Sequence, residues 1–254
     1  MPAPRGPRVL EFFANLGRMG LFLLRILGSI RPSASFIRDT ATQVFSVGSR
    51  SVSIVAVGGA FVGLVLALQG YRTLSTFGAG SSLGTLLGLT LYRELGPVLA
   101  AILFCGRAGS AMAAELGLMR ATDQITALSM MAIDPVRKVV APRFLAGVIS
   151  LPVLTMVFCA FAILGGWIQG VLVLGLDSGF YWSSLQQSID LVDDFGQAIV
   201  KSIFFGIVTT LIATFSGYHA APTIEGTSIA TTRSVVMGSL MVLFLDFILS
   251  ATLY

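Results

Sequence analysis

Long apolar runs alternate with short polar segments along the chain, and this pattern predicts helices that cross a membrane. A helix needs about 20 predominantly apolar residues to cross the hydrocarbon core of a bilayer. Segments of this kind are expected at about 51–71, 82–112, 139–175, 197–217 and 234–253. Gly59 and Gly63 form a GxxxG pattern in the first of them, which permits close contact with another helix. We therefore expect an all-α integral membrane protein, with residues 1–254 forming one domain.

The N-terminal segment 8–30 predicts an amphipathic helix rather than a sixth span. Its polar residues share one stripe, which consists of Glu11, Asn15, Arg18 and Arg25. A spanning helix would bury both arginines, at a cost of about 2.5–3.5 kcal/mol each near the membrane centre. A helix that lies in the membrane interface leaves them hydrated, so we favour that arrangement. The polar residues 31–50 are expected to form a cytoplasmic link that can hold a short helix after Pro32.

Composition and charge exclude a soluble protein and orient the predicted spans. Only 11% of the 254 residues are charged and 55% are hydrophobic, whereas soluble domains carry about 25% charged residues. Lys and Arg gather in the N-terminal region and in the 107–143 connection, while the loops at 72–81 and 176–196 hold only Arg72. The positive-inside rule then places the N-terminus in the cytoplasm and Tyr254 outside. Cytoplasmic loops thus explain the net charge of +4, and no nucleic-acid partner is implied.

The polar connection between the second and third spans predicts a short cytoplasmic helix within residues 115–134. Ile125, Leu128 and Met131 recur at three-residue spacing, which indicates one apolar helix face. Asp134 followed by Pro135 is a favourable N-cap with proline in the first helical position, so the next helix is expected to begin there.

Arg93 and Glu94 interrupt the second apolar run. They lie about eleven residues into it, or ~17 Å at 1.5 Å per residue, near the middle of a ~30 Å core. Charged residues at this depth are costly and indicate a functional site, here a polar spot for the headgroup of an amphiphile. Pro97 favours an irregular helix that opens a cavity. The alternative is that Arg93 pairs with Asp246, or Glu94 with Lys201, only to hold helices together.

The remaining chemistry is sparse. The sequence has no Walker A pattern, so the chain does not bind ATP by that route. His219 is the one histidine and no metal-ligand set surrounds it; Cys105 and Cys159 lie in apolar runs typical of buried thiols. A membrane-embedded lipid enzyme lacks an evident nucleophile or metal set. An ion-coupled secondary transporter using Glu94 and Asp246 stays open, although no inverted repeat is evident.

Two adjoining stretches, LYRELGPVLAAILFCGRAGSAMAAE at 91–115 and the connection at 113–143, resemble the MlaE/YrbE family of ABC transporter permeases, and the likeness extends over essentially the whole chain. The residues of the connection that match the family pattern are Glu115, Gly117, Met119, Arg120, Thr122, Asp123, Gln124, Ala127 and Leu128. Asp123 stands where Glu is more usual. Ala132 stands where Gly is common in the family, and this substitution argues against a sharp turn at that point.

The resemblance implies a multi-pass permease subunit of the bacterial inner membrane, without a cofactor of its own. It implies a homodimeric core, two cytoplasmic ABC ATPase subunits, a periplasmic hexamer of MCE-domain protein and often a small STAS-domain partner. The implied cargo is glycerophospholipid, moved between the inner membrane and the MCE carrier, a transport that contributes to outer-membrane lipid asymmetry.

The resemblance also assigns roles to residues. A coupling helix at 115–134 would dock in the ATPase through Glu115, Arg120, Thr122, Asp123, Gln124 and Leu128. Arg93 and Glu94 match the polar pair of the family at the lipid cavity. Arg233, where the last span leaves the cytoplasm, is a further candidate on the same lipid path.

Overall fold

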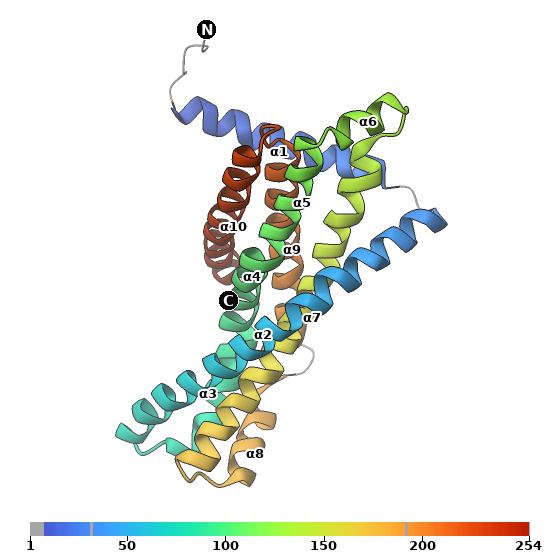
Figure 1. Cartoon of the computed structure of the whole chain (residues 1–254). Coiled ribbons are helices and arrows are strands. Elements are labelled where there is room, and N and C mark those ends of the chain that lie inside the picture. Colours follow the sequence, from blue (N-terminus) through green and yellow to red (C-terminus); the bar gives the residue numbers. More distant parts are fainter. Residues whose placement is uncertain (1–7, 31–32, 191–192, 254) are drawn as a thin grey trace.

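The computed structural model describes residues 8–30, 33–190 and 193–253, and within that part of the chain all regular structure is helical (Figure 1). Five helical segments are long and apolar enough to cross a membrane. They are Ala34–Thr76, Gly80–Ala121, Val136–Val173, Asp193–Tyr218 and Ile224–Thr252. The expected all-α membrane fold with five spans is thereby confirmed.

The first two spanning segments differ in their regularity. The helix α2 (Ala34–Thr76) is unbroken. The second segment comprises a short 3-10 turn at Gly80–Ser82 and three α-helices joined by two π-helical turns. Its α-helices are α3 (Leu83–Thr90), α4 (Gly96–Phe104) and α5 (Ser110–Ala121), and its π-helical turns are Leu91–Leu95 and Cys105–Gly109.

The second half of the chain completes the bundle. The short helix α6 (Gln124–Met130) precedes α7 (Ala141–Trp167), which π-helical turns flank at Val136–Val140 and Ile168–Val173. The helix α8 (Ser178–Ser188) connects to α9 (Asp193–Tyr218), and α10 (Ile224–Leu253) ends the described chain. The helix α6 lies at one end of the bundle and α8 at the other (Figure 1).

The short helix expected after Pro32 is instead the start of α2, which begins at Ala34 and continues unbroken into the first span. Within residues 34–50 only Val47 is buried, and the polar side chains are exposed or partly exposed. The segment 176–196 also contains a helix that the sequence did not predict. Asp177 caps α8 by accepting a hydrogen bond from the Phe180 amide at 2.9 Å.

The short helix expected within residues 115–134 is confirmed as α6, but the full stretch 115–134 is not one helix. Its residues are divided between the end of α5 and α6, with Asp123 between them at φ 55°. A second left-handed residue, Ala132 at φ 58°, follows α6. A residue in this conformation ends a helix, because the chain can no longer continue the right-handed turn. The predicted cap is confirmed: the Val136 amide donates to the Asp134 carboxylate at 3.1 Å.

The N-terminal helix α1 (Arg8–Ser29) runs across the end of the bundle rather than alongside the other helices (Figure 1). Phe22 and Ile26 are buried against the bundle, whereas Leu21, Leu24 and Leu27 are exposed. This arrangement leaves a second apolar face on α1, as expected of a helix in a membrane interface. The side chains of Glu11 and Asn15, half of the predicted polar stripe, lie outside the described residues.

The predicted GxxxG face is confirmed as the contact between α2 and α7. A Cβ atom added to Gly59 would lie 2.6 Å from the Phe158 carbonyl oxygen, and one added to Gly63 would meet the Ala162 carbonyl oxygen. Gly165 of α7 approaches the Ala60 carbonyl in the same way. The two helices are therefore packed backbone against backbone, which only glycine permits at these positions.

Replacing Ala132 by glycine is expected to stabilise the protein by about 0.5–1 kcal/mol. The left-handed conformation costs an L-residue roughly 1–2 kcal/mol, and the greater freedom of glycine in the unfolded chain offsets part of that gain. The thermal unfolding midpoint in detergent should rise by roughly 1–4 °C. The matched control is Ala127→Gly inside α6, where glycine should lower the midpoint; equal shifts of both variants would contradict the prediction.

Candidate functional site

Arg93 and Glu94 lie in the π-helical turn Leu91–Leu95, just before Pro97. Proline has no amide hydrogen, so the carbonyl group four residues before it loses its usual helical partner. That carbonyl belongs to Arg93, and the Lys201 ammonium donates a hydrogen bond to it at 2.7 Å. The expected irregular helix around Pro97 is confirmed. The Lys201 side chain of α9 donates a hydrogen bond to the carbonyl group that has lost its helical partner.

The Arg93 guanidinium pairs with Asp194 in the first turn of α9. Its Nε donates to the Asp194 carboxylate at 2.7 Å, and only 2% of the Asp194 side chain is exposed. The other carboxylate oxygen accepts a hydrogen bond from the Asp190 amide at 2.9 Å. The expected alternative partner of Arg93, Asp246, was therefore wrong, because the start of α9 and not the middle of α10 lies beside this guanidinium.

Lys201 carries the second half of this buried charge network. Its side chain is fully buried, and its ammonium donates to the Ser250 hydroxyl at 2.9 Å and lies 3.7 Å from the Asp246 carboxylate. Lys201 thus pairs with Asp246 and not with Glu94, contrary to the second alternative from the sequence. Together, these ion pairs and hydrogen bonds link the π-helical turn Leu91–Leu95 to α9, and α9 to α10.

The charge network lies nearer one end of the bundle than the sequence predicted. Asp194 is in the first turn of α9, a 26-residue helix, and Lys201 is about two turns further along it. The Arg93 guanidinium is accordingly beside the start of α9, at the end away from α6 (Figure 1), and not halfway along a span.

Glu94 differs from its neighbours because its side chain stays exposed. It lies within electrostatic range of Asp246 on α10. The result is one exposed carboxylate at the edge of a network in which Asp194 and Lys201 are buried and Arg93 and Asp246 are partly exposed. Such a carboxylate is available to a ligand or to another subunit without any rearrangement of the network.

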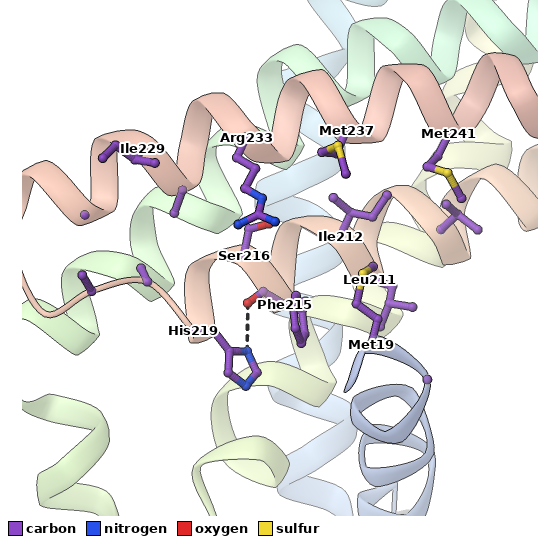
Figure 2. Close-up of a pocket in the computed structure, with 16 residues that line it drawn as sticks. Met19, Leu211, Ile212, Phe215, Ser216, His219, Ile229, Arg233, Met237 and Met241 are labelled. Atoms are coloured by element: carbon purple, nitrogen blue, oxygen red, sulfur yellow. Dashed lines mark hydrogen bonds between the residues drawn. The ribbon is translucent and has the colours of Figure 1, made fainter. Parts of the chain in front are cut away.

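Arg233 is in a separate place, a cavity of about 540 Å³ between α1, α9 and α10 (Figure 2). Its side chain points toward Ser216 of α9. Arg233 and Asp246 are separated by about 20 Å along α10 at 1.5 Å per residue. The three predicted substrate residues therefore form two sites, one with Arg93 and Glu94 and one with Arg233.

The six predicted coupling residues fall into two groups. Glu115 pairs with Arg143 at 3.3 Å, Arg120 donates to the Tyr218 carbonyl at 2.9 Å, and Leu128 is partly buried. The other three, Thr122, Asp123 and Gln124, are exposed at the turn between α5 and α6. The first group holds this end of the bundle together, and the second group is free to meet another protein.

Sequence reasoning missed two residues at this end. Met130 is 83% exposed and Met131 is 61% exposed, at the C-terminal end of α6. Two adjacent methionines in an otherwise polar connection were the available signal. Exposed methionines suit a contact surface, because their flexible side chains adapt to a partner.

Within the ranges that the structure describes, no group of three or more His, Cys, Asp or Glu residues is arranged to hold a metal ion. Cys105 and Cys159 are both buried free thiols, as their apolar surroundings predicted.

A sequence model described as Permease MlaE matches residues 40–252, most of the chain and all of the charge network. The chain belongs to the MlaE permease family.

Relatives similar over nearly the whole length agree with this membership. The intermembrane phospholipid transport system permease protein MlaE of Haemophilus influenzae is 49% identical over 98% of this chain and 95% of its own. A probable ABC transporter permease protein of Rickettsia typhi is 33% identical over 98% and 96%. The chloroplastic protein TRIGALACTOSYLDIACYLGLYCEROL 1 of Arabidopsis thaliana is 30% identical over 84% of this chain and 61% of its own.

Membership of the MlaE permease family and five apolar helices make the chain a multi-pass membrane protein of the ABC permease type. In this family member, Asp194 is a buried member of the charge network that the sequence did not single out. Lys201 was named from the sequence as a possible partner of Glu94, because a lysine within an apolar run must find a partner inside the protein, but its partner is Asp246.

Proposed function

We propose that this chain is the permease subunit of an ATP-driven transporter that moves glycerophospholipid between the bacterial inner membrane and a periplasmic MCE-domain carrier. The observation that carries the proposal is the 49% identity, over nearly the full length, to a permease whose name states intermembrane phospholipid transport. ATP hydrolysis would take place on a separate subunit, since the chain has no Walker A pattern. Such transport would contribute to outer-membrane lipid asymmetry.

The proposed topology places the N-terminus in the cytoplasm, α1 in the interface and the C-terminus on the periplasmic side. The distribution of Lys and Arg supports this orientation. So does the position of α1 and α6 at one end of the bundle (Figure 1), because both carry or adjoin the basic segments. The charge network of Arg93 would then lie toward the periplasmic side.

The proposed assembly is a homodimer with two ABC ATPase subunits, a periplasmic MCE-domain hexamer and, in addition, a STAS-domain protein. Support for the dimer comes from α10, which leaves a row of large apolar side chains exposed. They are Val236, Leu240, Leu243, Phe244 and Phe247. A second copy that packs on this row would place two Glu94 carboxylates around one central cavity, which suits a lipid headgroup.

The ATPase is proposed to bind the turn between α5 and α6 together with the end of α6. Thr122, Asp123 and Gln124 provide exposed polar groups, and Met130 and Met131 provide an exposed apolar contact. Arg120 links the end of α5 to the end of α9 through the Tyr218 carbonyl. Movement of the turn would therefore be passed directly to α9, the helix that carries Asp194 and Lys201.

Replacing Met130 by glutamate is expected to weaken ATPase binding by about 30-fold. Loss of a central apolar contact costs at least about 2 kcal/mol at an interface, and the new charge would be desolvated on docking. The measurement is the ATPase concentration that half-saturates the purified permease. Phe77→Glu, at an equally exposed position on the opposite end, is the control and should bind normally. Normal ATPase binding by Met130→Glu would contradict the proposal that the ATPase docks at Met130.

The proposed function is tested by purifying the chain from native membranes under mild conditions. A P-loop ATPase and an MCE-domain protein should co-purify, and their reading frames should neighbour that of this chain. Purification without an ATPase would contradict the proposal. That result would favour the alternatives, an ion-coupled secondary transporter that uses Glu94 and Asp246 or a membrane-embedded lipid enzyme.

A further inference from the structure

The cavity between α1, α9 and α10 has the size and the walls of a binding site for an apolar chain. Its volume of about 540 Å³ falls within the roughly 300–1,000 Å³ typical of ligand pockets. Leu211 and Phe215 of α9 face Met237 and Met241 of α10 across it (Figure 2). Flexible methionines on one wall suit a ligand without fixed shape, such as an acyl chain.

One end of this cavity is cationic. Arg233 is exposed and directed into it, and His219 lines the same end (Figure 2). Burial lowers the pKa of His219, the hydrogen bond to the Phe215 carbonyl opposes that change, and the nearby charges of Arg120 and Arg18 lower the pKa further. Arg233 therefore lies at this end of the cavity, and the charges of Arg120 and Arg18 act on its neighbour His219.

Among the described residues, no acidic side chain lines the cavity. The ion pairs of the described chain leave Arg233 without a carboxylate partner. A cation beside an apolar cavity in a membrane protein is stabilised by a counter-charge, which a bound anionic ligand would supply here. Phosphate oxygens fit arginine well, since both groups form paired charge-assisted hydrogen bonds.

We propose that this cavity binds one anionic membrane lipid from the adjacent leaflet, with its phosphate at Arg233 and an acyl chain along Met237 and Met241. The inference rests on the proposed function and deepens it, because it names a headgroup class and a first binding place. Met19 and Gly20 of α1 close one side of the cavity, so the interfacial helix forms part of the site. A free phosphate ion could bind Arg233 but would make no apolar contact with the walls of the cavity.

This site is distinct from the one at Glu94. Arg233 and Asp246, the residue of α10 that lies within electrostatic range of Glu94, are about 20 Å apart along α10. The network around Glu94 contains both signs of charge, whereas the described lining residues of the cavity at Arg233 are apolar or basic apart from Ser216, and none of them is acidic. A net positive site selects an anionic headgroup over a zwitterionic one, while a mixed site does not.

The test uses the full chain in bicelles with photoactivatable phosphatidylglycerol or phosphatidylcholine that carries a diazirine on one acyl chain. Mass spectrometry of the irradiated protein should place phosphatidylglycerol labels at Met237 and Met241, with much weaker labelling by phosphatidylcholine. Arg233→Gln should reduce the phosphatidylglycerol labels about tenfold or more, because it removes a hydrogen-bonded charge. Arg38→Gln, an exposed change at the same end, should leave them intact.

Equal labelling by both lipids, or absence of label from the cavity, would overturn the proposal. Loss of the labels in excess inorganic phosphate would identify a free-anion site and overturn it too. A thermal unfolding midpoint equal to that of the wild type shows that Arg233→Gln is folded. The proposed function fails separately: ATP-driven lipid transfer by the wild-type complex would be absent even where the cavity is labelled.

Discussion

Replacing Lys201 by methionine is expected to lower the thermal unfolding midpoint of the purified chain by roughly 6–20 °C. The Lys201 side chain is fully buried. Its ammonium donates hydrogen bonds to the Arg93 carbonyl and the Ser250 hydroxyl and forms an ion pair with the Asp246 carboxylate. Removing one partner from a buried ion pair costs about 3–5 kcal/mol, because the remaining charge stays without compensation. For a chain of this size each kcal/mol corresponds to roughly 2–4 °C, and the measurement is a melting curve in detergent.

Two further variants separate this cause from a general effect of losing a lysine. Lys201→Met combined with Asp246→Asn should recover part of the loss, since no uncompensated carboxylate remains. Lys138→Met removes an ion pair with Asp39 whose side chains are 53% and 39% exposed, and it should change stability by at most about 1 kcal/mol. Equal melting curves for Lys201→Met and Lys138→Met would contradict the buried network.

Replacing Glu94 by glutamine is expected to reduce lipid transfer roughly tenfold to a hundredfold while the protein stays folded. Glu94 is exposed at the edge of the network, so glutamine keeps its shape and removes only its charge. A hydrogen bond to a charged group contributes about 1.5–3 kcal/mol, and tenfold in rate corresponds to about 1.4 kcal/mol. The measurement is the initial rate of labelled phospholipid transfer by the reconstituted complex.

Glu94→Gln is a sharper test of the polar site than Arg93→Ala. The alanine variant would also leave Asp194, which is 2% exposed, without its guanidinium partner and would destabilise the fold. Glu225→Gln, an exposed change at the other end of α10, is the matched control and should transfer lipid normally. Lipid transfer at the wild-type rate by Glu94→Gln would contradict a role for the Glu94 carboxylate in lipid transport.

The sequence predicted the features that depend on local pattern. Apolar length identified the five spans, Gly59 and Gly63 identified a close helix contact, and Pro97 identified an irregular helix. Each of these follows from the chemistry of a single segment, since proline lacks an amide hydrogen and glycine lacks a side chain wherever they stand.

The sequence did not predict which charges meet. Arg93 pairs with Asp194, about a hundred positions away, because the folded chain places the first turn of α9 beside a π-helical turn. In sequence, Asp194 stands among other acidic residues, and nothing near it in the chain points to Arg93. The turn between α5 and α6 was also missed, because its left-handed residue is Asp123 and not glycine; Ala132, the left-handed residue after α6, is not glycine either.

We propose that this chain conducts phospholipid under the control of a partner ATPase. The most direct measurement follows labelled phospholipid from proteoliposomes that contain the purified complex to a soluble MCE-domain acceptor. We expect transfer that requires hydrolysable ATP and that stops when the ATPase subunit is removed. Transfer at the same rate without ATP, or transfer driven by an ion gradient alone, would contradict it.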